Sequence, residues 1–525
     1  MTTSTWGSTK FNVAALTGNG TSLNWQAAAG TLSNLVTVAS TGGISNRGSG
    51  LFTMTNLTGL PSAGILELNN DDSSTGSGIS LSGNYPTLTG DITYKFSGAR
   101  FANAANTIGS TAITGMLDVG AAPRTITMDY SPGVASTGTP ATTSLLTVGN
   151  LVLTSNTILN GDGSGTLQSI TGSGTLTYSG TQILNMTGGA TSTANSGVTV
   201  NSGIIRIGNS SVVTAGALSG GPVGTGLLTL AAGTTIQDNN VARTLGNSLE
   251  LLGSTTFSTS GTTHTPSLTG PGRLTFDDTG LTVPSTITIN AATNPTLTVN
   301  TLTTFNEALG LAGGATGFTK AGTGRLVIGR SYTGTINATA GTLALHPTLN
   351  LPGSNITMNP GAYLVLQGAG SLASDVSIVS GSALLLQPPS QAILDSADVA
   401  STGVAALGVD SAVNLDFSAF TGGFRLGAAP GSFTYSGLLT PAASTYRLGG
   451  GGGHLTMKGL LSGAGNSLEV GLGGMAVSEV VLDNAANTYG GGTTIGAAMP
   501  LVVRSNGSLG DSAGGVTFGT AGGAL

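Results

Sequence analysis

Residues 334–387 read GTINATAGTLALHPTLNLPGSNITMNPGAYLVLQGAGSLASDVSIVSGSALLLQ and contain one unit three times. Its glycines, Gly341, Gly361 and Gly381, stand twenty residues apart. Apolar residues recur at fixed offsets of five before, three before and four after each glycine: Ile336, Ile356 and Val376; Ala338, Met358 and Ile378; Leu345, Val365 and Leu385. Apolar positions two residues apart indicate a strand with one buried face. A glycine between two such strands suits a bend with positive φ.

Repetition with a period of about twenty residues is typical of a solenoid, in which each unit forms one coil. We expect Leu345, Val365 and Leu385 to form one buried column of the stack, and Ile336, Ile356 and Val376 another. The fold class predicted is therefore all-β: an elongated parallel β-solenoid. We expect a right-handed β-helix, because crossovers between parallel strands are nearly always right-handed.

Composition favours the same fold. The 525 residues include 87 Gly, 7% charged residues and 39% hydrophobic residues, so the chain is neither collagen-like nor a disordered polar tract. With 21 acidic and 15 basic residues and no basic cluster, the sequence lacks the footprint of a nucleic-acid-binding protein. The absence of Cys would suit export as an unfolded chain, since disulfides would block passage, or it reflects chance in a repetitive sequence.

No secretion signal is recognisable in residues 1–25, and no apolar run is long enough for a membrane helix. An exported chain would have lost its signal, belong to a longer chain or use another route. Along the chain the repeat predicts five segments: an N-terminal cap or irregular start at 1–60, less regular coils with loops at 61–160, regular solenoid at 161–387, interrupted coils and a loop at 388–445, and further coils at 446–525 that end within a coil.

Two segments carry a more specific pattern, Thr319 to Leu343 and Asn487 to Ile495. The first contains Lys320-Ala321-Gly322-Thr323-Gly324-Arg325-Leu326, and the second reads NTYGGGTTI. They resemble the passenger-associated repeats of bacterial autotransporters and related surface proteins, whose pattern is K-x-G-x-G-x-L followed by N-x-Y-x-G-x-T-x-I. The resemblance implies a right-handed parallel β-helix that is exported and, as often in this family, held at the cell surface. Two features depart from the family: Ser331-Tyr332 lacks the usual Asn, and no outer-membrane translocator follows residue 525.

Parallel β-helices also include polysaccharide hydrolases and lyases, and hydrolysis of a glycosidic bond needs a pair of carboxylates. The candidates are Asp71 with Asp72 and Asp277 with Asp278. Neighbours on a strand point to opposite faces, and Asp beside turn residues favours its own backbone, so we interpret both pairs as turns. His264, His346 and His454 have no carboxylate nearby in sequence. The segment Gly161 to Leu167 is similar to a calcium-binding turn, but its single Asp162 supplies too few ligands.

We therefore expect no catalytic, cofactor-binding or metal-binding residues, and a protein that is not an enzyme. Exposed faces of the coils should carry Thr, Ser and Asn together with tyrosines, among them Tyr94, Tyr130, Tyr178, Tyr435 and Tyr446. The leading hypothesis is an extracellular structural protein, a fibre or matrix subunit that assembles end to end. An adhesin or carbohydrate-binding passenger that contacts a host or neighbouring cell is the alternative, and a polysaccharide-degrading enzyme is the third.

Overall fold

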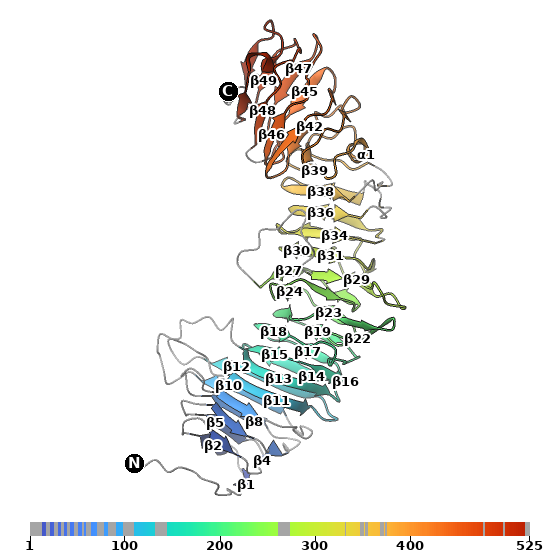
Figure 1. Ribbon diagram of the computed structural model, residues 1–525. Helices are drawn as coiled ribbons and strands as arrows, with labels where there is room; N and C mark the ends of the chain where they lie inside the picture. Colours follow the sequence, from blue (N-terminus) through green and yellow to red (C-terminus); the bar gives the residue numbers. More distant parts are fainter. Residues whose placement is uncertain are drawn as a thin grey trace, which may run out of the picture. The chain divides into compact units, whose positions relative to one another are not determined.

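The computed structural model describes residues 116–128, 146–260, 274–330, 332–346, 351, 355–367, 372, 375–475, 478–496 and 499–519 with their side chains, and gives the backbone of further strands between 13 and 145. These strands build a β-solenoid of about 16 turns with almost no helix (Figure 1). The chain divides into two compact units: unit 1 comprises residues 1–263 and 273–288, and unit 2 comprises residues 264–272 and 289–525.

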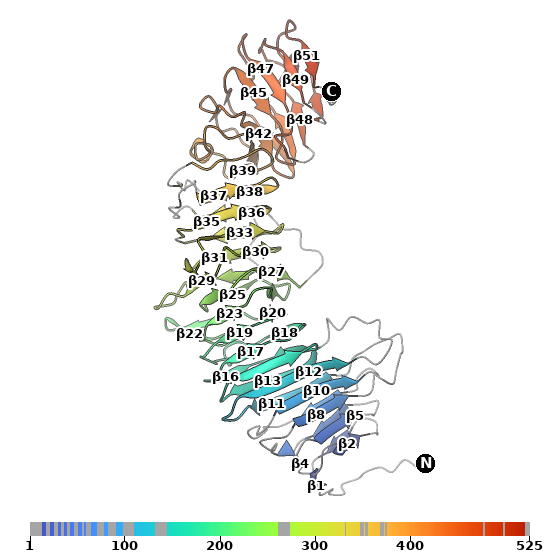
Figure 2. The ribbon, with the colours of Figure 1, turned by 180° about the vertical axis from the view of Figure 1, so that it is seen from behind.

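Unit 1 is built on two long parallel sheets (Figure 2). The β2–β26 sheet contains, in order, β2 (Thr21–Trp25), β5 (Gly42–Asn46), β8 (Ile65–Asn70), β10 (Asp91–Ser97), β12 (Arg124–Ser131), β14 (Thr157–Gly161), β17 (Leu176–Tyr178), β19 (Val198–Val200), β23 (Leu228–Leu230) and β26 (Leu249–Leu251). The β3–β27 sheet contains β3 (Gly30–Leu32), β6 (Leu51–Met54), β9 (Gly78–Leu81), β11 (Ser110–Asp118), β13 (Ser144–Leu153), β15 (Ser164–Leu167), β18 (Ile183–Met186), β20 (Ile204–Ile207), β24 (Thr235–Asp238) and β27 (Thr255–Thr259).

Shorter strands complete unit 1: β1 (Val13–Leu16), β4 (Val36–Val38) and β7 (Leu57–Thr58) form one small sheet, β16 (Ile170–Gly172) pairs with β13, and β25 (Arg243–Leu245) pairs with β28 (Leu274–Phe276). The strands β21 (Val212–Thr214) and β22 (Ala217–Gly220) form an antiparallel hairpin. Segment 1–60, expected to be a cap or an irregular start, thus contains strands β1 to β7. Strand β29 (Thr286–Ala291) crosses the boundary between the units.

Unit 2 has three parallel sheets and one pair of strands. The longest, the β31–β51 sheet, contains β31 (Thr303–Phe305), β34 (Arg325–Ile328), β36 (Gly341–Leu345), β38 (Ala362–Leu366), β39 (Ala383–Leu386), β40 (Val404–Leu407), β42 (Arg425–Ala428), β45 (Thr445–Leu448), β47 (Ser467–Val470), β49 (Thr493–Ile495) and β51 (Val516–Phe518). Beside it lie β30 (Thr296–Val299), β33 (Gly317–Ala321), β35 (Thr335–Ala338) and β37 (Ile356–Met358) in one sheet, β43 (Ser432–Tyr435), β46 (His454–Met457), β48 (Glu479–Leu482) and β50 (Leu501–Val503) in another, and the pair β41 (Leu415–Asp416) and β44 (Leu439–Thr440).

Unit 2 also contains the strand β32 (Ala308–Gly313), the short helix α1 (Gln391–Leu394) and the 3-10 turn η2 (Asn506–Leu509). Helix α1 lies in the segment 388–445, where an interruption was expected. Its N-cap is Ser390, whose side chain accepts a hydrogen bond from the Ile393 N–H. The β31–β51 sheet nevertheless continues through this segment with β40 and β42.

The core is a set of apolar columns that follow the strand register. In unit 1, Leu176, Val198, Leu228 and Leu249 are successive partners on β17, β19, β23 and β26. Each of these side chains is at most 1% exposed. Such burial contributes about 1.5–3 kcal/mol for each aliphatic side chain, so the columns account for most of the stability of a stack.

The predicted column of Leu345, Val365 and Leu385 is wrong at Leu345, which does not pair with Val365. Ile336 and Ile356 are partners, as expected, while the buried Val376 forms a bridge with Ala397. On the other strand, Leu345 is paired with Leu366, whereas Val365 is paired with Ala344 and Leu385. The three glycines do have the expected positive φ, of 62°, 90° and 88°.

The cause is one extra residue in a bend. Two residues, Thr339 and Ala340, separate β35 from β36, whereas three, from Asn359 to Gly361, separate β37 from β38. Gly341 consequently pairs with Ala362 rather than with Gly361. Because successive strand residues point to opposite faces, this shift places Leu345 and Val365 on different faces of the sheet.

Candidate functional site

Of the two acid pairs, the structure describes Asp277 with Asp278, and the Asp277 carboxylate serves a turn. The Asp277 carboxylate accepts hydrogen bonds from the Thr279 N–H at 2.9 Å and from the Thr279 hydroxyl at 2.6 Å, which is the turn contact expected from the sequence. Asp278 is buried, at 4% exposed. Asp71 and Asp72 lie outside the described residues.

The same use of aspartate recurs along both units. Within the described part of the chain, the backbone N–H two residues further on donates a hydrogen bond to the carboxylate of each of these aspartates: Asp118, Asp238, Asp277, Asp398, Asp416 and Asp511. These distances lie between 2.6 and 2.9 Å. The carboxylates thus hold corners of the coils, where the backbone leaves the sheet and its N–H groups need acceptors.

One histidine does gain a carboxylate neighbour through the fold. His454 on β46 and Glu479 on β48 are partners in register, and their side chains approach to 3.4 Å. Both are partly exposed, at 53% and 32%. This pair could not be found from the sequence, because stacking joins residues 25 positions apart. His346 follows β36, and His264 lies outside the described residues.

The segment that is similar to a calcium turn is a corner between β14 and β15. Gly161 has a φ of 100°, and the Gly163 N–H donates to the Met128 carbonyl at 2.8 Å. Among the residues that the structure describes, no group of three or more His, Asp or Glu side chains could hold a metal ion.

Lys320 of the first repeat motif is a buried lysine with a structural role in unit 2. Its Nζ donates to the carbonyls of Gly322, Gly324 and Ala340 at 2.7–2.8 Å, and the residue is 0% exposed. Burial lowers the pKa of Lys320 to about 7. The lysine therefore ties the bend after β33 to Ala340, which lies in the following turn.

The tyrosines of the motifs fill corners. The Tyr332 hydroxyl donates to the Thr335 carbonyl at 3.1 Å, and the Tyr489 hydroxyl lies 2.7 Å from the Thr493 hydroxyl. A Cβ on Gly334 would lie 2.5 Å from the Tyr332 hydroxyl, so the glycine of the motif leaves room for the ring. The fixed spacing of tyrosine and glycine in the repeat motif thus reflects packing of Tyr332 against Thr335, the first residue of β35.

Asn487 links three successive turns. Its amide oxygen accepts from the Leu461 N–H at 3.0 Å, and its amide nitrogen donates to the Ser508 carbonyl at 2.8 Å. The residue is 6% exposed. The Asn487 side chain stabilises the stack, because without it the Leu461 N–H and the Ser508 carbonyl would lose these hydrogen-bond partners.

The expectation that tyrosines lie on the exposed faces of the coils is wrong for three of them, which are buried. Tyr178, Tyr435 and Tyr446 are 0–3% exposed. Their hydroxyls donate to the carbonyls of Gln182, Leu438 and Ser462. A tyrosine can occupy a core position if its hydroxyl finds such a partner, and sequence alternation cannot reveal this. The side chains of Tyr94 and Tyr130 are outside the described set.

The outward face of the β3–β27 sheet in unit 1 carries a polar ladder. Strand register aligns Thr166, Asn185, Arg206 and Gln237. Asn185 donates to the Thr166 hydroxyl at 3.4 Å, and Arg206 donates to the side-chain oxygens of Asn185 and Gln237 at 3.4 and 3.3 Å. The four side chains are half-buried and form a continuous row of polar groups along the turns.

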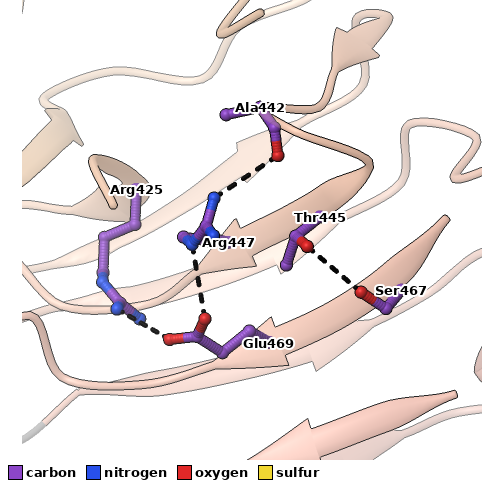
Figure 3. A network of polar contacts seen from close by, with 6 residues as sticks. All are labelled: Arg425, Ala442, Thr445, Arg447, Ser467 and Glu469. Carbon is purple, nitrogen blue, oxygen red and sulfur yellow. Dashed lines mark hydrogen bonds and ion pairs between the residues drawn. The ribbon is translucent and has the colours of Figure 1, made fainter. Parts of the chain in front are cut away.

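Unit 2 carries a charged network on the outward face of the β31–β51 sheet (Figure 3). Glu469 lies between two guanidinium groups: one oxygen is 2.9 Å from Arg425 Nη2, and the other is 3.3 Å from Arg447 Nε. Arg447 also donates to the Ala442 carbonyl at 3.4 Å, and the hydroxyls of Thr445 and Ser467 lie 3.2 Å apart beside it. The network bridges β42, β45 and β47 and has a net charge of +1.

Comparison of the chain with protein-family models, with curated proteins and with solved structures finds no match. Within the described residues, no helix is long and apolar enough to cross a membrane. The site geometry and the fold are therefore the basis for a functional proposal.

Proposed function

We propose that the protein is a structural protein of the extracellular space or cell surface, a β-solenoid subunit of a fibre or matrix. The observation that carries this proposal is the use of charged side chains. Among the described side chains, aspartates accept hydrogen bonds from turn N–H groups, Lys320 bonds to three carbonyls, and Glu469 bridges two arginines. Charged side chains that are bonded to the backbone or to one another favour a scaffold over a reaction centre.

Self-association is the second part of the proposal. Val516 and Phe518 on β51 are the register partners of Thr493 and Ile495, which are buried core positions of the preceding turn. Val516 and Phe518 are 38% and 48% exposed. A further turn stacked on β51 would bury these side chains and pair the strand edge, and in our proposal a second copy of the chain supplies that turn.

Mass photometry over a concentration series tests this self-association. The parent protein should form species larger than one chain as concentration rises, and Phe518→Asp should shift that association to at least about tenfold higher concentration. Val283→Asp is the matched control, because Val283 is 79% exposed and lies in unit 1. Equal association of the parent and Phe518→Asp would contradict a role for this edge.

An adhesin is the second candidate, and the polar ladder of unit 1 is the observation that favours it. Hydroxyl, amide and guanidinium groups at Thr166, Asn185 and Arg206 repeat with the spacing of the turns. Such a row can donate and accept hydrogen bonds along an extended polysaccharide chain. A glycan array probed with the parent and with Arg206→Ala tests this: binding that the substitution removes supports an adhesin, and an array without any binding contradicts it.

A further inference from the structure

The outward face of the β31–β51 sheet is apolar and buried over several turns of unit 2. Val327, Ala344, Val365, Leu385 and Ala406 form one column by register. These side chains are 0–8% exposed and belong to a single apolar cluster. Thr304 on β31 is the register partner of Val327 and so begins this column. Its neighbours Thr303 and Phe305 are buried inside the coil, whereas Thr304 is half-buried and lies on the opposite, outward face.

Two later segments cover this face, and we call them together the glycine strap: Gly449–Gly453, which follows β45, and Gly471–Met475, which follows β47. A Cβ on Gly451 would lie 3.1 Å from the Ala406 Cβ. On Gly450 or Gly473, it would lie 2.8 Å from a Val404 methyl group. Met475 is 8% exposed and belongs to the same apolar cluster.

Hydrogen bonds connect the strap to turns that come several strands earlier in the sheet. The Tyr363 hydroxyl on β38 donates to the Gly451 carbonyl at 2.9 Å, across 88 positions of sequence. The Gly381 N–H donates to the Gly473 carbonyl at 2.8 Å. In the sheet, β39, β40 and β42 separate β38 from β45. These contacts therefore skip several turns, whereas a solenoid repeat ordinarily contacts only its neighbours.

Only glycine fits the first segment. Gly449, Gly450, Gly451 and Gly452 have φ values of 103°, 88°, 87° and 86°. Space is equally restrictive, because a Cβ on Gly451 would lie 2.4 Å from the Ala428 carbonyl oxygen. Gly449 to Gly452 are thus required by their backbone conformation, and the close approach to β40 and β42 leaves no room for a side chain on Gly451.

We infer that the glycine strap is a conformational lock that joins the turns from β38 to β47 into one cooperative unit. Without it, each turn would open against its nearest neighbour alone, and an apolar outer face would be exposed. With it, opening of β38, β39 or β40 requires release of two segments that belong to later turns. The lock accounts for a glycine run and for aliphatic residues on both faces of one sheet.

Hydrogen exchange read by mass spectrometry tests the lock, with the intact chain and three variants. Gly451→Ala should release the strap, because the added Cβ meets the Ala428 carbonyl. Gly423→Ala is the control for backbone strain, since Gly423 has a φ of 95° and no atom within 4 Å of an added Cβ. Tyr363→Phe removes only the hydroxyl that bonds to Gly451.

In Gly451→Ala, amides of β38 to β40 should exchange about 100-fold faster than in the parent. Tyr363→Phe should change the same amides by a smaller factor, and Gly423→Ala should leave them unchanged. Faster exchange confined to β42, β45 and β46 in Gly451→Ala would overturn the inference, because it would mean that the turns open one at a time. If, in addition, the exchange rates of the β38 amides were the same in Tyr363→Phe as in the parent, the hydrogen bond from Tyr363 to Gly451 would not stabilise β38 at all.

Discussion

At the scale of single residues, polar side chains serve the backbone at the corners of the coils. Asp277 accepts hydrogen bonds within a turn, the ring of Tyr332 fills a corner, and Lys320 donates hydrogen bonds to carbonyls of two turns. The sequence predicted the aspartate turn, because Asp beside turn residues has a local preference. The roles of Lys320 and of the tyrosines could not be predicted, because their partners lie in neighbouring turns or depend on the path of the corner.

Lys320 should make stability depend on pH. The pKa is lowered to about 7 in the folded protein, while an unfolded lysine keeps its proton up to about 10.4. Between these values the unfolded state binds more protons, so the free energy of unfolding should rise with pH, by at most about 1.4 kcal/mol for each pH unit. Urea unfolding from pH 6 to 9 should show this rise in the parent and a smaller rise in Lys320→Met. Equal slopes would contradict a Lys320 whose pKa is lowered by folding.

Buried tyrosines should limit stability at high pH. Burial raises the pKa of Tyr435 to about 12, although the Leu415 N–H partly opposes this, and burial also raises the pKa of Tyr332. An unfolded tyrosine ionises near pH 10, so the stabilisation is complete below about pH 10 and is lost as pH rises toward the folded value. Tyrosinate absorbance should therefore rise together with unfolding above pH 10. A titration complete near pH 10 in protein that stays folded would contradict the burial.

At the scale of strands, the sequence predicted the unit and its period but not its register. Gly341, Gly361 and Gly381 mark bends with positive φ, as their spacing indicated. The extra residue before β38 then moved Leu345 out of the column of Val365. Side-chain alternation identifies a buried face only when the other face meets water, and here Val365 is buried on the outward face. An apolar run on a strand covered on both faces carries no periodic signal.

Val365→Asp should destabilise unit 2 strongly. The substitution buries a carboxylate in an apolar cluster where Val365 is 3% exposed, so we expect a loss of about 3 kcal/mol or more. Val502→Asp is the matched control, because Val502 is 39% exposed, and its effect should stay within about 0.5 kcal/mol. Thermal unfolding measures both variants, and a Val365→Asp curve that overlays the parent would mean that this column does not exist.

At the scale of the whole molecule, the sequence predicted a parallel β-solenoid, and the structure confirms it. The fold could be predicted because the same spacing of apolar residues and glycines recurs in successive turns. The glycine strap escaped prediction for the opposite reason: it joins Tyr363 to Gly451 across 88 positions and has no periodic signature. Export, location at the cell surface and assembly stay proposals that rest on the resemblance to passenger-associated repeats and on the exposed core positions of β51.

Electron microscopy of the native material at neutral pH tests the proposed fibre most directly. The proposal expects filaments in which one chain follows another, with strands spaced about 4.8 Å apart along the stack. Filaments should be lost in Phe518→Asp and kept in Val283→Asp. Isolated particles at every concentration of the parent protein would contradict assembly through β51, and the adhesin would then be the better account of this protein.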